Sequence, residues 1–212
     1  NTKLLQQHVH NKNKADTLSR NMVSKIRALQ NGDMAISTFG GGVNIASGPN
    51  DKLVFSQLLS EEFVNMEALD IVEDEDQRLW IATMGNGLIV YSKQDASFTQ
   101  LNYTNDDEAK LLSNNIFALY NSPNYIWFGT QESGLGRISK QSVNSEQLEV
   151  TYFDSKMGIP SNAIYGVLAD ANNNMWLSHA KGLSKLSTET NEVINFSADH
   201  GLQGKDFTAG AF

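Results

Sequence analysis

The sequence predicts an all-β protein made of β-propeller blades of four antiparallel strands, present as a partial propeller of about four blades plus two partial ones. Three tryptophans, Trp80, Trp127 and Trp176, lie 47 and 49 residues apart, and each begins an apolar stretch that runs to a glycine. A second motif, with Leu-Ser at Leu18 and Leu112, recurs upstream of these stretches. Two linked motifs with a period of ~40 to 50 residues are typical of propeller blades.

One repeat shows the expected strands. An apolar run with little polar interruption predicts a buried strand, and residues that tolerate left-handed backbone angles predict tight turns. Strands are expected at Ala68–Val72, Leu79–Thr83, Leu88–Tyr91 and Phe98–Tyr103, with turns at Glu73–Asp76 and Gly85–Gly87. In this arrangement the tryptophan packs between neighbouring blades.

The blades are expected at 18–62, 63–110, 111–158 and 159–201. The first has Ala35 at the tryptophan position, and the second replaces the upstream motif by Phe63, Val64, Asn65 and Met66. Residues 1–17, with apolar Leu4, Leu5 and Val9, fit the end of a preceding blade, and 202–212 restart the upstream motif. We therefore expect a segment of a larger propeller.

Composition excludes several classes of protein. The net charge is −8 with no long Lys/Arg cluster, so nucleic acid is not an expected partner. No apolar run approaches the ~18 residues that a membrane span needs. The sequence has no cysteine, which excludes a disulfide framework and fits an oxidising compartment.

The motifs that suggest chemistry have simpler explanations. His8 and His10 would share one face of a strand and could share a metal, but two solvated histidines fit better. The spacing of Glu73–Asp76 matches no calcium loop and favours a solvated turn. Gly40–Gly42 and Gly85–Gly87 precede strands and not helices, so they are hairpin turns and not phosphate loops. We expect no metal, no cofactor and no catalytic residue.

The order of the two motifs resembles the two-component regulator propeller repeat of bacterial sensor proteins. The resemblance runs from Leu18 to Leu186 in four copies, and the tail from Gly201 to Phe207 resembles a segment that often follows a last full repeat of this family. Departures are Ala35 for the tryptophan, Gln77 in a turn and His179 for the threonine.

The resemblance implies the periplasmic sensor region of an inner-membrane protein, with a histidine kinase or diguanylate cyclase as cytoplasmic output. The implied mechanism is ligand capture on the propeller face, which changes the geometry of a dimer. That requires a ligand that favours one arrangement over the other.

A ligand would bind where the upstream motif and the loop after the Thr/Ser strand bring side chains toward the axis. Equivalent loops of a repeat array differ where the ligand differs. These positions are Arg20, Asn21, Phe39, Met84, Asn86, Asn115, Gln131, Glu132, Asn162, His179 and Lys181. The three upstream asparagines (Asn21, Asn115 and Asn162) are better explained as caps of turns, whereas Arg20, Gln131, Glu132, His179 and Lys181 fit both interpretations.

Three classes of function remain. The first is a sensor of a small molecule or glycan fragment, which the resemblance and the lack of catalytic signatures favour. The second is a scaffold for dimerisation or protein docking, since exposed blade edges invite strand pairing. The third is a propeller glycan lyase or hydrolase. We also expect self-association through the open blade faces of a partial ring.

Overall fold

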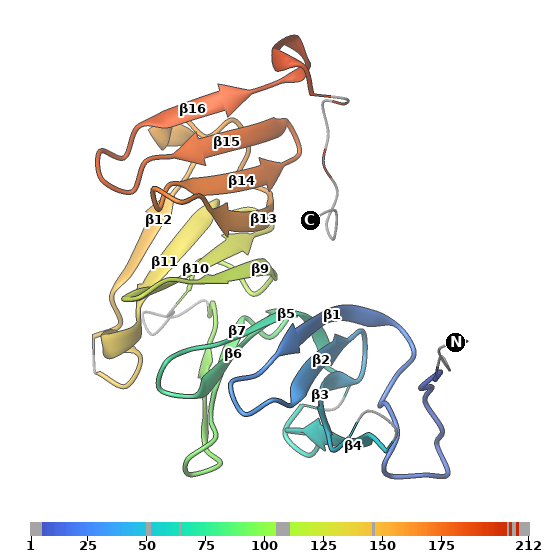
Figure 1. The fold of residues 1–212 in the computed structure, drawn as a ribbon. Helices are drawn as coiled ribbons and strands as arrows, with labels where there is room; N and C mark the ends of the chain where they lie inside the picture. Colours follow the sequence, from blue (N-terminus) through green and yellow to red (C-terminus); the bar gives the residue numbers. More distant parts are fainter. Residues whose placement is uncertain are drawn as a thin grey trace.

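The computed structural model of the chain describes residues 6–49, 52–63, 65–104, 111–145, 147–202, 204 and 207. Within these residues the chain forms four sheets, each of four antiparallel strands that follow one another in sequence (Figure 1). Three short 3-10 helices accompany them: η1 (Lys140–Ser142), η2 (Ser155–Met157) and η3 (Ala198–His200). The predicted fold class, an all-β propeller of four-stranded blades, is confirmed.

The sheets are numbered here in chain order. Sheet 1 contains β1 (Val23–Ala28), β2 (Met34–Thr38), β3 (Gly42–Ser47) and β4 (Val54–Leu58). Sheet 2 contains β5 (Glu67–Glu73), β6 (Arg78–Met84), β7 (Leu88–Ser92) and β8 (Phe98–Leu101). Sheet 3 contains β9 (Ile116–Asn121), β10 (Tyr125–Thr130), β11 (Leu135–Ser139) and β12 (Val150–Phe153). Sheet 4 contains β13 (Ile164–Ala169), β14 (Met175–His179), β15 (Gly182–Leu186) and β16 (Val193–Phe196).

The strands expected in the second repeat are those of sheet 2, with one difference at the end. The fourth strand was expected to continue to Tyr103, but β8 ends at Leu101. The backbone N–H of Tyr103 instead donates to Asn114 Oδ1 over 2.8 Å. This bond turns the chain away from the sheet edge and toward the next sheet.

A glycine begins or directly precedes each third strand, and in sheets 2 to 4 the backbone of the fourth strand passes close to it. Gly87 has a φ of 74°, and a Cβ there would lie 2.2 Å from the carbonyl oxygen of Leu101. A Cβ on Gly134 would likewise lie 2.3 Å from the carbonyl oxygen of Phe153, and a Cβ on Gly182 would lie 2.3 Å from that of Phe196. The repeated glycine is therefore required by both the turn and the close approach of the fourth strand.

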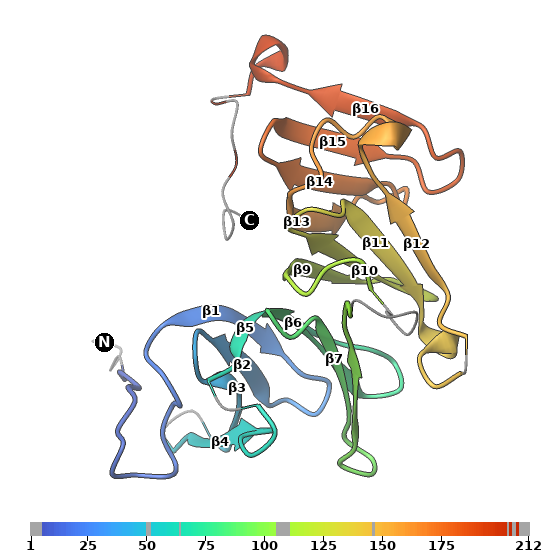
Figure 2. The ribbon, with the colours of Figure 1, turned by 180° about the vertical axis from the view of Figure 1, so that it is seen from behind.

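The first strands of the four sheets lie side by side in chain order, with β5 between β1 and β9, and β9 between β5 and β13. Figures 1 and 2 show the sheets as an arc around this inner row, with the fourth strands outside. Each first strand also shifts register against its neighbour at the same place, one or two residues after it begins. A recurring bulge of this kind re-aims the side chains around it.

Two of the tryptophans pack between sheets, as predicted. Trp80 is fully buried in a cluster that includes Ile116 and Phe128 of sheet 3. Trp127 is 2% exposed and lies in a cluster with Ile164 and Leu177 of sheet 4. Burial of a side chain of this size is a large favourable term in folding, so the tryptophans join each sheet to the next.

The third tryptophan lies on the outer face of sheet 4. Trp176 is half-buried and stacks on Phe196, with ring centroids 5.3 Å apart and planes inclined by 20°. Ile194, which lies in β16 with Phe196, is 56% exposed. The described residues place no further sheet against this face.

Several sequence predictions fall outside the described residues. These are Leu4, Leu5 and Val64, and most of the tail motif at 202–212, including Gln203, Lys205 and Asp206. The blade boundaries likewise remain predictions. Within the described ranges, no helix has the length and apolar character needed to cross a membrane.

Candidate functional site

The turns between the first and second strands define one end of the sheets, called here the turn end. In sheet 2, Asp74 occupies this turn and is fully buried. Its Oδ2 accepts hydrogen bonds from Arg78 Nε at 2.7 Å and from the indole N–H of Trp80 at 2.8 Å. Its Oδ1 accepts the backbone N–H groups of Asp76 and Arg78. One carboxylate therefore holds the turn, the arginine and the inter-sheet tryptophan together.

The expectation of a solvated acidic turn is wrong for half of that turn. The side chains of Glu73 and Asp74 are 5% and 0% exposed, whereas those of Glu75 and Asp76 are 64% and 73% exposed. Buried carboxylates need partners, and Glu73 pairs with Lys93 while Asp74 pairs with Arg78. Within the described part of the chain, no group of three His, Asp or Glu side chains could hold a metal ion.

The bond from the turn to the tryptophan recurs in the other sheets that have a tryptophan. In sheet 4 Asp170 Oδ2 accepts the indole N–H of Trp176 at 3.2 Å, and in sheet 3 Ser122 Oγ accepts that of Trp127 at 3.3 Å. Hydrogen bonds from Asn174 hold the pKa of Asp170 far below its ordinary value. Sequence reasoning missed this pairing, although an acceptor five or six residues before each tryptophan was a visible signal.

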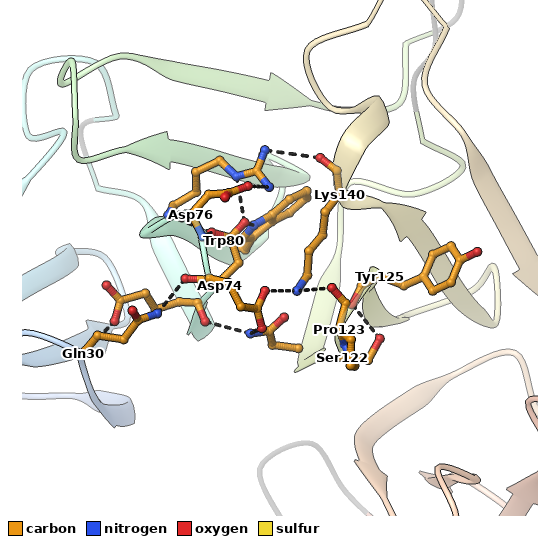
Figure 3. Close-up of polar contacts among 12 residues, drawn as sticks. Gln30, Asp74, Asp76, Trp80, Ser122, Pro123, Tyr125 and Lys140 are labelled. Atoms are coloured by element: carbon orange, nitrogen blue, oxygen red, sulfur yellow. Dashed lines mark hydrogen bonds and ion pairs between the residues drawn. The ribbon is translucent and has the colours of Figure 1, made fainter.

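Polar contacts join sheets 1, 2 and 3 at the turn end (Figure 3). The backbone N–H of Gln30 donates to Glu73 Oε2 at 2.6 Å, and its side-chain amide donates to the carbonyl of Asp74 at 2.7 Å. From the other side, Asn121 Nδ2 donates to the carbonyl of Glu73 at 2.9 Å. The β5–β6 turn is therefore held by both neighbouring sheets.

Lys140 completes this turn-end network from sheet 3. Its ammonium group pairs with Glu75 and also donates to the carbonyl of Pro123 at 3.3 Å, while its own carbonyl accepts from Arg78 Nη1 at 3.2 Å. Burial pushes the pKa of Glu75 upward, but the hydrogen bond and charge of Lys140 outweigh burial and lower this pKa below its ordinary value. Lys140 is itself 6% exposed.

Asp70 links the inner strands in the middle of the sheets. It is fully buried, accepts the backbone N–H of Leu119 in β9 at 3.0 Å, and pairs with Arg27 of β1 at 3.3 Å. Burial raises its pKa above the ordinary value, although the charge of Arg27 and two backbone hydrogen bonds oppose the rise.

A pocket of about 330 Å³ lies beside this pair at the inner face of the sheets. The first three sheets contribute polar groups to it and the fourth contributes Leu168. It is lined by Arg27, Ala28, Gln30, Val72, Glu73, Leu119, Tyr120, Asn121 and Leu168.

The residues expected from the sequence to bind a ligand lie at the opposite end, called here the loop end. Three of them come together between sheets 2 and 3. Asn115 accepts the backbone N–H of Gly85 at 2.9 Å and donates to Gln131 Oε1 at 2.6 Å, and it forms a bridge with Met84. Asn115 thus caps a turn, as the alternative interpretation expected. Its side chain also contacts that of Gln131, a second candidate.

The candidates between sheets 1 and 2 are more dispersed. Arg20 is exposed and donates to Asn65 Oδ1 at 3.2 Å. Asn21 accepts the backbone N–H of His10, and Phe39 donates its own N–H to the carbonyl of Met22. No hydrogen bond or ring contact joins these three candidates to one another within the described residues.

The remaining candidates lie in separate loops. The side chain of Asn86 makes no hydrogen bond to another described residue. Its backbone N–H donates to Thr83 Oγ1, and its carbonyl accepts from Gln100 Nε2. Asn162 accepts the N–H of Ser155, and its carbonyl accepts that of Gly134. Glu132 and Lys181 are exposed.

His179 lies inside sheet 4 and not on the loop surface where we expected its side chain. It is fully buried, its Nε2 bonds with Ser184 Oγ at 2.8 Å, and its Nδ1 accepts the N–H of Lys181. Thr83 plays the same part in sheet 2 by accepting the N–H of Asn86. His179 therefore replaces the threonine as a cap of the hairpin, and burial together with the charge of Lys181 lowers its pKa to about 4.

The two N-terminal histidines also have partners. The ring of His8 lies 5.1 Å from that of Phe55 in β4. His10 is half-buried and its Nδ1 contacts the carbonyl oxygen of Leu18 at 2.7 Å. They therefore pack against sheet 1, and only His8 keeps the exposure that we expected of both.

Comparison with known proteins agrees with this architecture. Residues 62–85, which span the β5–β6 hairpin, match the family described as "Two component regulator propeller". The chain carries a two-component regulator propeller repeat. The resemblance drawn from the sequence is thereby confirmed.

Individual relatives are distant. The chain is 22% identical to "Histidine kinase P4" of Formosa agariphila, over 72% of this chain and 14% of that protein. It superposes with a TM-score of 0.71 on the extracellular domain of the hybrid two-component system BT3049 of B. thetaiotaomicron, at 22% identity, covering 90% of this chain and 25% of that chain. A virginiamycin B lyase of Staphylococcus aureus superposes with a TM-score of 0.61 at 14% identity, over 90% of this chain and 58% of the lyase. These structural likenesses show the propeller fold.

Proposed function

We propose that the chain is an extracytoplasmic ligand-sensing propeller segment of a bacterial membrane-bound signal-transduction protein. The observation that carries this proposal is the two-component regulator repeat at 62–85, within a fold shared with the extracellular domain of a hybrid two-component system. The similarity to a histidine kinase supports a sensor role. A periplasmic location and a histidine kinase or diguanylate cyclase output are part of the proposal.

In this function the segment binds and does not catalyse. A ligand changes the output only if it binds one arrangement of the sensor more tightly than the other. The turn-end network supports such a role because its hydrogen bonds and ion pair connect three sheets, and contiguous networks of this kind are able to carry coupling between sites. The loop-end candidates between sheets 2 and 3 remain the sequence-based proposal for the ligand contact.

The test measures binding and signalling on the same protein. A thermal-shift screen of the 212-residue chain against small metabolites and glycan fragments identifies a ligand, because a ligand that binds the folded state raises its melting temperature. The ligand is then added to membranes that contain the natural protein, and phosphorylation or cyclic dinucleotide synthesis is measured. The proposal predicts a changed output, and an unchanged output at a saturating ligand concentration contradicts it.

A scaffold is the second candidate, favoured by the outer face of sheet 4. There the half-buried Trp176, the stacked Phe196 and the exposed Ile194 form an apolar surface. Exposed apolar patches mark interaction sites, so self-association of the chain through this face is proposed. Sedimentation at several concentrations tests it: Ile194→Glu should shift the chain toward the monomer, and an unchanged monomer in both proteins contradicts it.

A further inference from the structure

A second pocket lies between sheets 3 and 4 at the turn end, apart from the loop-end candidates and the inner-face pocket. It has a volume of about 230 Å³. Sheet 3 and its turn supply Ser122, Pro123, Asn124, Tyr125, Trp127 and Arg137, and sheet 4 supplies Asn173, Met175 and Thr188. None of these lining residues is acidic. The pocket therefore holds the positive charge of Arg137 without a negative charge among its lining residues.

Arg137 is held by aromatic rings. Its guanidinium carbon lies 4.5 Å from the ring centre of Tyr125, 5.2 Å from that of Trp127 and 5.5 Å from that of Phe153. Aromatic faces attract cations at these distances. The rings fix the direction of the guanidinium group, which is thus pre-organised before any ligand arrives.

Arg137 has no acidic partner within the described residues, in contrast to the other two strand arginines. Arg27 pairs with Asp70, and Arg78 pairs with Asp74 and Asp76. No hydrogen bond to either terminal nitrogen of Arg137 is present in these residues, and its Nε is buried without a partner. A half-buried, unpaired and immobilised guanidinium group favours an anion from outside the chain.

The lining residues indicate the kind of anion. The free edge of a guanidinium group matches a planar carboxylate. The side-chain amides of Asn124 and Asn173, which both line the pocket, make no hydrogen bond to other described residues and are therefore available as donors. Met175, Pro123 and Tyr125 supply an apolar wall. Figure 3 shows Tyr125 directed away from Lys140, on the other side of the β9–β10 turn from the turn-end network.

We infer that the pocket between sheets 3 and 4 is a binding site for a small carboxylate, with Arg137 as its anchor. This inference is independent of the sensor role proposed above. Binding of a carboxylate is measured on the chain itself and requires no signalling output. Its apolar wall and single positive charge suit a monovalent acid with a compact apolar body.

Benzoate is a suitable probe, and benzamide is its neutral counterpart of the same shape. Nitrogen-15 NMR of the chain reports on the site through the indole N–H of Trp127, which bonds to Ser122 beside the pocket. We expect benzoate to shift this resonance in a saturable way and benzamide to leave it unchanged. Equal effects of the two compounds, or no shift with benzoate, would overturn the inference.

Two variants locate the site, and a third is the control. Arg137→Met keeps an apolar side chain against the rings and should weaken benzoate binding at least about tenfold. Asn124→Asp adds a carboxylate at the exposed rim of the pocket; it should fold normally and also weaken binding by repulsion. Lys52→Met removes an equal charge from an exposed loop of sheet 1 and should bind as the original chain does.

If Arg137→Met does not fold, Asn124→Asp decides the question alone. Undiminished binding of benzoate in a folded Arg137→Met protein, or in Asn124→Asp where the first variant is unfolded, contradicts the assignment.

Discussion

The two interfaces on either side of sheet 3 use the same apolar packing but differ in their polar groups. Trp80 fills the interface between sheets 2 and 3, and Trp127 fills that between sheets 3 and 4. At the turn end, Asn121 and Lys140 bind acidic residues of sheet 2. No hydrogen bond or ion pair of the described residues crosses from sheet 3 to sheet 4 at that end, where the pocket of Arg137 lies instead.

The difference shows how a repeat array acquires individual sites. The backbone, the glycine and the tryptophan recur because each sheet must pack on the next. Asp74 and Asp170 recur as turn acceptors. Arg78, Lys140 and Arg137 have no such counterpart, and their placement makes one interface a closed network and the other an open pocket. We therefore treat sheets 1 to 3 as one polar-linked unit to which sheet 4 is attached mainly by apolar contacts.

The largest expected effect comes from breaking the closed interface. Asp74→Ala leaves Arg78 and the indole N–H of Trp80 without their buried acceptor, which should lower the free energy of unfolding by about 3–5 kcal/mol. The matched change in sheet 4, Asp170→Ala, should cost clearly less because Asp170 is partly exposed. Chemical denaturation of both variants measures this, and equal losses would contradict the comparison.

Between neutral pH and about pH 4, the pH dependence of stability should come mainly from His179 of sheet 4. Its pKa falls from 6.5 to about 4 on folding because it is buried. The unfolded chain therefore takes up the proton first, so this contribution to stability is complete above about pH 6.5 and is lost as the pH falls toward 4. The loss is roughly 3 kcal/mol.

The control for this effect is His179→Thr, which restores the residue found at Thr38, Thr83 and Thr130 in the other sheets. Thermal unfolding between neutral pH and pH 4 should lose most of its pH dependence in this variant. If both proteins lose the same stability between neutral pH and pH 4, groups other than His179 cause the pH dependence.

A smaller effect is expected at Gly129, where sheet 4 passes close to sheet 3. A Cβ on Gly129 would lie 2.6 Å from the backbone oxygen of Ile164 in β13. Gly129→Ala should therefore push the two sheets apart and cost about 1–3 kcal/mol. Sheet 2 carries Ala82 at the equivalent position, fully buried; Ala82→Gly should cost no more than about 1 kcal/mol. A neutral Gly129→Ala, measured by urea unfolding, would contradict the close approach.

Much of the fold was predictable because it depends on recurring local signals. The spacing of the tryptophans gave the repeat length, and the alternation of apolar runs and turn residues located the strands of sheet 2 to within one or two residues. The end of β8 was not predictable. It depends on a hydrogen bond from Tyr103 to Asn114, eleven residues away in sequence.

The sites were less accessible to sequence reasoning because they depend on register and on contacts between sheets. Arg137 is ten residues from Trp127, and only strand pairing shows that the two are opposite each other. Asp74 was expected to be solvated because it lies in an acidic run, Glu73–Asp76, at a predicted turn. Its role follows from the indole N–H of a buried tryptophan, which needs an acceptor.

Native-state hydrogen exchange tests most directly whether sheet 4 is the separable part of the chain. The account predicts that backbone amides of β13–β16 exchange through an opening of lower free energy than amides in the interiors of sheets 1 to 3, because no polar network ties sheet 4 at the turn end. A single common free energy of opening for all four sheets, equal to that of global unfolding, would contradict it.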